Sequence, residues 1–132
     1  MITLDASALL ALLNRKDVNH DRAVHVLDDR PGPYLVPMAI LAEVAHLIET
    51  RHGSRMMGVL LDDLGEGTFS PECGEEDFPR IRSLTERYSD LPLGFADGAV
   101  IACAERRGGA VFTFDLRHFG VVSREGRIGI VP

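Results

Sequence analysis

The chain has 132 residues, of which 45% are hydrophobic and 26% are charged, a composition typical of one soluble globular domain. Its net charge of −6 argues against a protein that binds nucleic acids through a general positive charge. The longest apolar run, YLVPMAILA, is shorter than the roughly 20 residues that span a bilayer, and the N-terminus lacks the basic start of a signal peptide. We therefore expect a single domain over residues 1–132 in a cytoplasmic protein with no membrane partner.

Segments with strand and helix patterns alternate along the chain. In chain order we expect a strand over residues 2–5, helices over 6–14 and 19–29, a strand over 34–37, helices over 38–53 and 54–67, a strand over 68–71, helices over 75–90 and 94–109, and strands over 110–114 and 127–131. The segment DLRHFG, residues 115–120, is assigned no element. This alternation predicts βαβ units, and therefore an α/β fold with a mainly parallel sheet covered by helices on both faces.

Four carboxylates stand where such a fold places functional groups. Asp5 ends the first strand and Asp115 follows the strand over 110–114, so the two acids share one rim of the sheet if those strands are neighbours. Asp97 lies in the first turn of its helix, and Glu43 lies at the edge of the buried face of the helix over 38–53. Each aspartate alone could be a helix cap, and Glu43 could be partly exposed or paired with an arginine. Capping does not explain why four acids point at one rim.

Four carboxylates in one pocket require a positive partner, because two unit charges about 4 Å apart repel by roughly 4 kcal/mol at an effective dielectric constant of about 20. Mg²⁺ or Mn²⁺ fits, since both prefer oxygen ligands, and no histidine and cysteine set suggests zinc. Such a cation activates water and stabilises charge on a phosphoryl oxygen, which predicts hydrolysis of a phosphate ester. Ser7 and Thr113 stand two residues from Asp5 and Asp115, and their hydroxyls either orient carboxylates or water, or serve as an ordinary cap and strand residue. The cysteines, Cys73 and Cys103, are expected to be free thiols.

Four segments carry a resemblance to a known family: LDASALLALL, AEVAHLI, GFADGAVIACAERRG and TFDLRHF. In order and spacing they resemble the acidic motifs of PIN-domain ribonucleases, and most of all those of the VapC-like toxins of bacterial toxin–antitoxin pairs. The resemblance implies a three-layer α/β/α sandwich, RNA cleavage with Mg²⁺ or Mn²⁺, a homodimer, and a small VapB-like antitoxin that blocks the site. Asp5, Glu43, Asp97 and Asp115 match the acidic positions, and Ser7 and Thr113 match polar ones. Gly98 departs from the pattern, because the family more often has alanine there.

Basic side chains near these motifs are the candidates for RNA contact. Arg117 and His118 follow Asp115 closely and are the preferred candidates; the others are Arg15, Arg106 and Arg107. The chain has no Trp, two Tyr and six Phe, which leaves few rings for base stacking. We therefore expect a structured RNA substrate, whether tRNA, rRNA or mRNA, recognised by its shape and phosphates.

Three other interpretations remain open. A receiver domain or a phosphatase similar to the haloacid dehalogenases also places an aspartate after the first strand, but both need a lysine late in the chain. Lys16 is the only lysine, and Ser7 stands where the phosphatase pattern has a second aspartate. A PIN-like module that has lost its chemistry is the third alternative, and the presence of all four acids argues against it.

Overall fold

Five short strands form the centre of the computed structural model, which describes all of residues 1–132. They are β1 (Ile2–Leu4), β2 (Tyr34–Pro37), β3 (Phe69–Glu72), β4 (Ala110–Phe112) and β5 (Gly129–Val131). Their order across the sheet is β3-β2-β1-β4-β5, and every neighbouring pair is parallel. Because β1 pairs directly with β4, the strands that end before Asp5 and Asp115 are neighbours, as the argument from the sequence requires.

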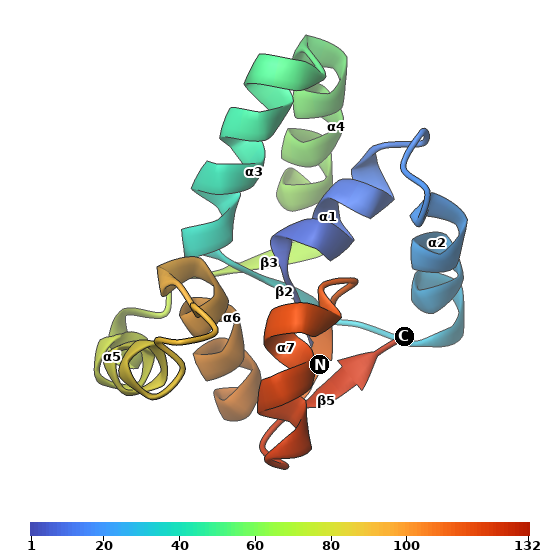
Figure 1. Cartoon of the computed structure of the whole chain (residues 1–132). Coiled ribbons are helices and arrows are strands. Elements are labelled where there is room, and N and C mark those ends of the chain that lie inside the picture. The colour runs from blue at the N-terminus through green and yellow to red at the C-terminus, as the bar shows by residue number, and fades with distance from the viewer.

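Seven α-helices cover the sheet. They are α1 (Ala6–Leu13), α2 (His20–Asp29), α3 (Met38–Arg51), α4 (Ser54–Gly65), α5 (Phe78–Arg87), α6 (Phe95–Arg106) and α7 (Leu116–Arg124). The sheet lies between α1 and α2 on one side and α5 and α6 on the other (Figure 1), and α6 packs directly against β1 and β4. The predicted three-layer α/β/α architecture is therefore confirmed. No helix is both long and apolar enough to cross a bilayer.

The core is continuous, with 28 buried residues in one cluster. Every residue of α6 from Gly98 to Ala104 is buried, since this helix lies between the sheet and α5. A Cβ atom at Gly98 would lie 3.1 Å from Cγ2 of Ile81, tighter than ordinary van der Waals contact. The glycine at this position therefore allows α5 to approach α6 closely, which gives a packing reason for the departure from alanine.

Two elements differ from the sequence prediction near the end of the sheet. The strand expected over residues 110–114 ends at Phe112. The backbone N–H of Thr113 still donates to Val131 O at 3.0 Å, but that of Phe114 donates to Ser7 Oγ in the acidic site, so the chain leaves the sheet there. The segment DLRHFG, to which no element was assigned, begins α7. Asp115 caps this helix: its Oδ1 accepts hydrogen bonds from the backbone N–H groups of Arg117 and His118.

The helix expected over residues 75–90 is also shorter than predicted. It divides into a 3₁₀ turn, η1 (Glu75–Asp77), and α5, which ends at Arg87. Proline lacks a backbone N–H and has a fixed φ, so it is accommodated best in a first helical turn. A helix that begins at Phe78 places Pro79 there, which explains the break.

Candidate active site

The four predicted acids lie together at the carboxyl ends of β1 and β4. A cleft of about 260 Å³ is lined by all of them and by Ser7, with apolar walls from α1, α3 and α6. Asp5 lies between β1 and α1, Glu43 on α3, Asp97 in the first turn of α6, and Asp115 at the start of α7. Four segments that are far apart in the sequence therefore contribute one carboxylate each to the same cleft.

Asp5 is the most buried of the four, with 5% of its surface exposed. Its Oδ1 accepts hydrogen bonds from Ser7 Oγ at 2.7 Å and from the backbone N–H of Ala8 at 2.9 Å. Its Oδ2 accepts one from Thr113 Oγ1 at 2.6 Å. Burial raises the pKa of Asp5, and these hydrogen bonds act in the opposite direction because they stabilise the ionised form. The carboxylate between the first strand and the first helix is therefore held in a fixed orientation by three donors.

Ser7 and Thr113 also connect the two halves of the site. Thr113 Oγ1 accepts a hydrogen bond from the backbone N–H of Asp115 at 2.9 Å, and Ser7 Oγ accepts one from the N–H of Phe114 at 3.0 Å. The two hydroxyl oxygens lie 3.4 Å apart. The loop after β4 is thus fastened to the first turn of α1, which sets where Asp115 stands relative to Asp5.

His118 lies between two of the acids. Its Nδ1 is 3.0 Å from Asp115 Oδ2 and 3.3 Å from Asp97 Oδ2. Burial raises the pKa of Asp97; His118 lowers it, and the charges of Asp115, Asp5 and Glu43 raise it further. The sequence suggested His118 as an RNA contact and did not anticipate this position among the carboxylates. The signal available was its spacing of three residues from Asp115, which places both side chains on one face of a helix.

Glu43 lies at the rim of the cleft with an exposed side chain, between the buried residues Ile40 and Val44. We expected Glu43 at the edge of the buried face of its helix, not on the outside, whereas its side chain is exposed. The reason is that α3 borders an open cleft at this point, so no neighbouring element covers the side chain.

The basic candidates fall into two groups. Arg15 and Arg117 are exposed, and neither lines the cleft. Arg106 and Arg107 are already paired: Arg106 Nε lies 3.0 Å from Asp77 Oδ1, and Arg107 Nη2 lies 2.8 Å from Glu72 Oε1. The two arginines at the end of α6 therefore belong to an ion-pair network, and only the first group has side chains free to contact a phosphate.

The donor set of the cleft fits a hard divalent cation, because it consists of carboxylates and hydroxyls without a cysteine. No three acidic, histidine or cysteine side chains are grouped closely enough to hold an ion as they stand. Carboxylates that repel one another are expected to stay apart until a cation lies between them. Binding an ion therefore requires the more exposed acids to rotate toward Asp5.

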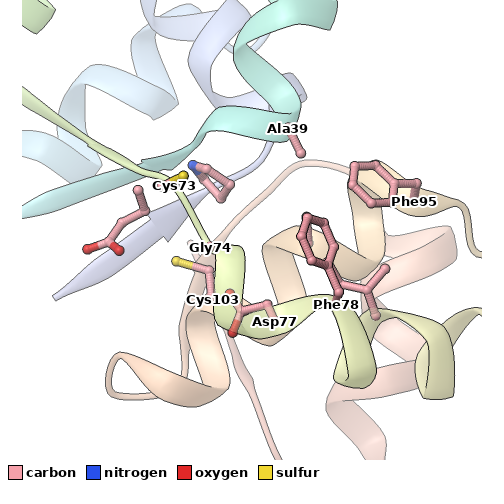
Figure 2. Close-up of a pocket in the computed structure, with 11 residues that line it drawn as sticks. Ala39, Cys73, Gly74, Asp77, Phe78, Phe95 and Cys103 are labelled. Carbon is pink, nitrogen blue, oxygen red and sulfur yellow. The ribbon is translucent and has the colours of Figure 1, made fainter.

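A second cavity, of about 30 Å³, lies between β3, η1 and α6 (Figure 2). Phe78 and Phe95 stand at its edge, and Cys73 and Cys103 both line it as free thiols, as predicted. Burial raises the pKa of the Cys103 thiol, so this group stays protonated and unreactive. The acid that faces the cavity from η1, Asp77, is neutralised by Arg106. Neither Cys103 nor Asp77 is therefore free to act in this cavity, and the acidic cleft is the candidate site.

Comparison with known proteins agrees with this geometry. The family model described as "PIN domain" matches residues 2–124. The chain is 28% identical to Ribonuclease VapC26 of Mycobacterium tuberculosis, over 98% of each protein. The fold is similar to the crystal structure of M. tuberculosis VapC20, described as a sarcin-ricin loop cleaving toxin, with a TM-score of 0.82 and 21% identity over 100% of both chains. It is also similar to a chain of a toxin–antitoxin complex from Klebsiella pneumoniae, with a TM-score of 0.73 and 19% identity over 100% of this chain and 97% of that one. The family model spans nearly the whole sequence, and the parallel sheet and the acidic cleft are consistent with that match. The protein therefore belongs to the PIN domain family.

Proposed function

We propose that the protein is a metal-dependent endoribonuclease toxin that hydrolyses RNA phosphodiester bonds and is inhibited by a cognate VapB-like antitoxin. The observation that carries this proposal is the single cleft lined by Asp5, Glu43, Asp97 and Asp115. The relatives support it: one is named a ribonuclease, another is described as a sarcin-ricin loop cleaving toxin, and a third comes from a toxin–antitoxin complex.

Each acid has a separate task in this proposal. Asp5, already oriented by Ser7 and Thr113, is the fixed ligand for Mg²⁺ or Mn²⁺. Asp97, Asp115 and Glu43, which line the same cleft, would supply the remaining carboxylate ligands. When bound, the cation activates water and stabilises the negative charge that develops on the phosphoryl oxygens. The hydroxyls of Ser7 and Thr113 favour the ionised form of Asp5 against the effect of burial and fix its orientation, so the site needs little rearrangement there.

RNA is held by groups around the cleft rather than by the net charge of the protein. Arg117 is exposed one turn from the acids, and Arg15 is exposed in the turn after α1. Their guanidinium groups suit phosphate oxygens, and a bound cation makes the local field more positive. His118 contacts the RNA only if it leaves its present position between Asp97 and Asp115. The substrate is a structured RNA of the tRNA, rRNA or mRNA class.

The protein acts as a homodimer in this proposal. Phe78 and Phe95 expose 59% and 55% of their surfaces and flank the small cavity together (Figure 2). A second copy of the chain that covers these rings would remove apolar surface from water. Sedimentation velocity tests this: we expect a dimer for the wild type and for Val18→Glu, which changes an exposed residue elsewhere, but a monomer for Phe78→Glu. A monomeric wild type would contradict the proposal.

The phosphatase and receiver alternatives gain no support from the arrangement of the chain. Lys16, the only lysine, is exposed in the turn after α1 and does not line the cleft. An inactive PIN-like module would keep the fold but show no stabilisation by Mn²⁺ that depends on Asp5.

Mapping RNA ends across the transcriptome after brief expression tests the function directly. We expect new 5′ ends at a small set of sites with the wild type and with Asp90→Asn, which changes an exposed acid outside the cleft. Asp97→Asn should produce none. Equal cleavage by Asp97→Asn and the wild type would contradict the proposal.

A further inference from the structure

An arginine covers an aromatic ring directly beside the acidic cleft. Phe114 stands in the chain between Thr113 and Asp115, two residues of the site. The guanidinium carbon of Arg22, on α2, lies 5.3 Å from the centroid of the Phe114 ring. This pairing has no part in the function proposed above, and it joins a helix from the first quarter of the chain to the loop that carries Asp115.

The ring of Phe114 is held in place from two sides. Its backbone N–H donates to Ser7 Oγ at 3.0 Å, so its position depends on the same hydroxyl that orients Asp5. The buried ring of Phe112 packs against it edge to face, with centroids 5.6 Å apart and an angle of 64° between the planes. Phe114 itself is only partly buried. It is therefore a supported apolar surface with a face that is covered by one exposed, flexible side chain.

The positive charge of Arg22 is not used within the protein. No carboxylate lies within ion-pair distance of it, whereas Arg80, Arg106 and Arg107 all have carboxylate partners. Its only polar contact is a long one of 3.5 Å to Asn19 Oδ1. An exposed guanidinium without an acidic partner, placed over a ring at the edge of an acidic site, is suited both to stacking on a base and to contacting a phosphate.

We propose that Phe114 and Arg22 bind one unpaired base of the RNA, stacked between the ring and the guanidinium, next to the phosphate in the acidic cleft; this deepens the proposed function and rests on it. A base stacked on both faces needs two spacings of about 3.4 Å. Because the guanidinium carbon already lies 5.3 Å from the ring centroid, Arg22 has to move outward by only about 1.5 Å to admit the base. Because Phe114 precedes Asp115 directly, with Cα atoms about 3.8 Å apart, the stacked base belongs to a nucleotide adjacent to the reacting phosphate. The cleavage site is then a single-stranded loop or bulge within the structured RNA.

Tryptophan fluorescence tests the stacking, because the chain has no Trp and Phe114→Trp introduces a single reporter. The probes are a short oligoadenylate, measured in EDTA because the proposed cleavage needs a divalent cation, and an abasic sugar-phosphate oligomer of equal length and charge. We expect the oligoadenylate to quench Phe114→Trp, and the abasic oligomer to leave it unquenched. Leu61→Trp, a reporter at an exposed residue of α4 outside the cleft, should respond to neither. Equal quenching by both oligomers, or equal quenching of both reporters, would overturn the proposal.

Affinity for the same oligoadenylate gives a second measurement. Phe114→Leu should weaken binding about tenfold, within the range found for loss of one base–aromatic stack, while Phe114→Tyr should bind as the wild type does. Arg22→Met should weaken binding several-fold, and Arg124→Met, which removes an exposed and unpaired arginine from the far end of α7, should not. Melting temperatures check that each variant is folded. Unchanged affinity of folded Phe114→Leu would overturn the stacking.

The two proposals fail in different ways. Quenching of Phe114→Trp by oligoadenylate without any RNA cleavage by the wild type in Mg²⁺ would support the stacking and refute the nuclease. Cleavage that depends on Asp97, together with no quenching of Phe114→Trp, would support the nuclease and refute the stacking.

Discussion

We expect Asp97→Asn to raise the stability of the metal-free protein and to abolish the stabilisation that Mn²⁺ gives the wild type. Asp97 Oδ2 and Asp115 Oδ2 both contact Nδ1 of His118, at 3.3 and 3.0 Å. Their separation therefore cannot exceed about 6 Å, where two unit charges repel by roughly 3 kcal/mol at an effective dielectric constant of about 20. Burial of Asp97 and the charges of Asp5 and Glu43 add to the cost of ionising it.

Two effects reduce this gain. The carboxylates of Asp97 and Asp115 are 27% and 36% exposed, so solvent screens their repulsion, and the variant also loses a charged partner for His118. We expect a net stabilisation of about 1 to 2 kcal/mol, which for a chain of this length raises the melting temperature by roughly 3 to 8 °C.

Scanning calorimetry at neutral pH, in EDTA and then in excess Mn²⁺, measures both parts of the prediction. In EDTA Asp97→Asn should melt above the wild type, and Asp90→Asn, an exposed acid outside the cleft, should melt with the wild type. Mn²⁺ should raise the melting temperature of the wild type and of Asp90→Asn but not that of Asp97→Asn. A lower melting temperature for Asp97→Asn in EDTA, or an equal response to Mn²⁺, would refute the reasoning.

Three further predictions concern the buried carboxylates and the groups that contact them. Thr113→Val removes a buried hydroxyl that donates to Asp5 and accepts from Asp115 N–H, so urea unfolding should show a loss of about 1 to 3 kcal/mol, while Thr113→Ser keeps most of the stability. Equal stability of the Thr113→Val and Thr113→Ser variants would contradict the role of that hydroxyl. Burial raises the pKa of Asp5 in the folded protein, so its contribution to stability is present at low pH and is lost as the pH rises through the folded value. In EDTA, Asp5→Asn should therefore flatten the rise in stability as the pH falls from neutral toward the ordinary pKa of an aspartate. An unchanged slope would contradict this role of Asp5. Arg106→Met leaves the buried carboxylate of Asp77 without its partner and should cost about 3 kcal/mol in the same assay. A restored stability in the double variant with Asp77→Asn is expected, and no restoration would contradict the pairing.

The sequence was sufficient for the architecture because strand and helix patterns alternate along almost the whole chain. Asp5 and Asp115 could be placed at one rim from the sequence, since each follows a strand and parallel strands end at the same edge. The neighbouring positions of β1 and β4 were a condition of that argument, and the sheet order meets it.

The features that the sequence did not reveal depend on contacts between distant segments, or on the lack of a segment that covers a side chain. α7 was missed because its apolar pattern is short, and the helix depends on Asp115 to cap its first turn. The sequence left the exposure of Glu43 open, because it depends on the absence of a neighbour across the cleft. The pairing of Arg22 with Phe114 requires α2 to pack beside the loop after β4, which no local pattern specifies.

The central claim is that carboxylates from four separate segments share one divalent cation. An anomalous difference map from crystals grown in Mn²⁺ tests it most directly. We expect one strong peak in the cleft, in contact with carboxylate oxygens of Asp5 and Asp97, and no such peak in crystals of Asp97→Asn. Crystals of the wild type at saturating Mn²⁺ that show no peak in the cleft, or a peak only on other surfaces, would contradict the claim.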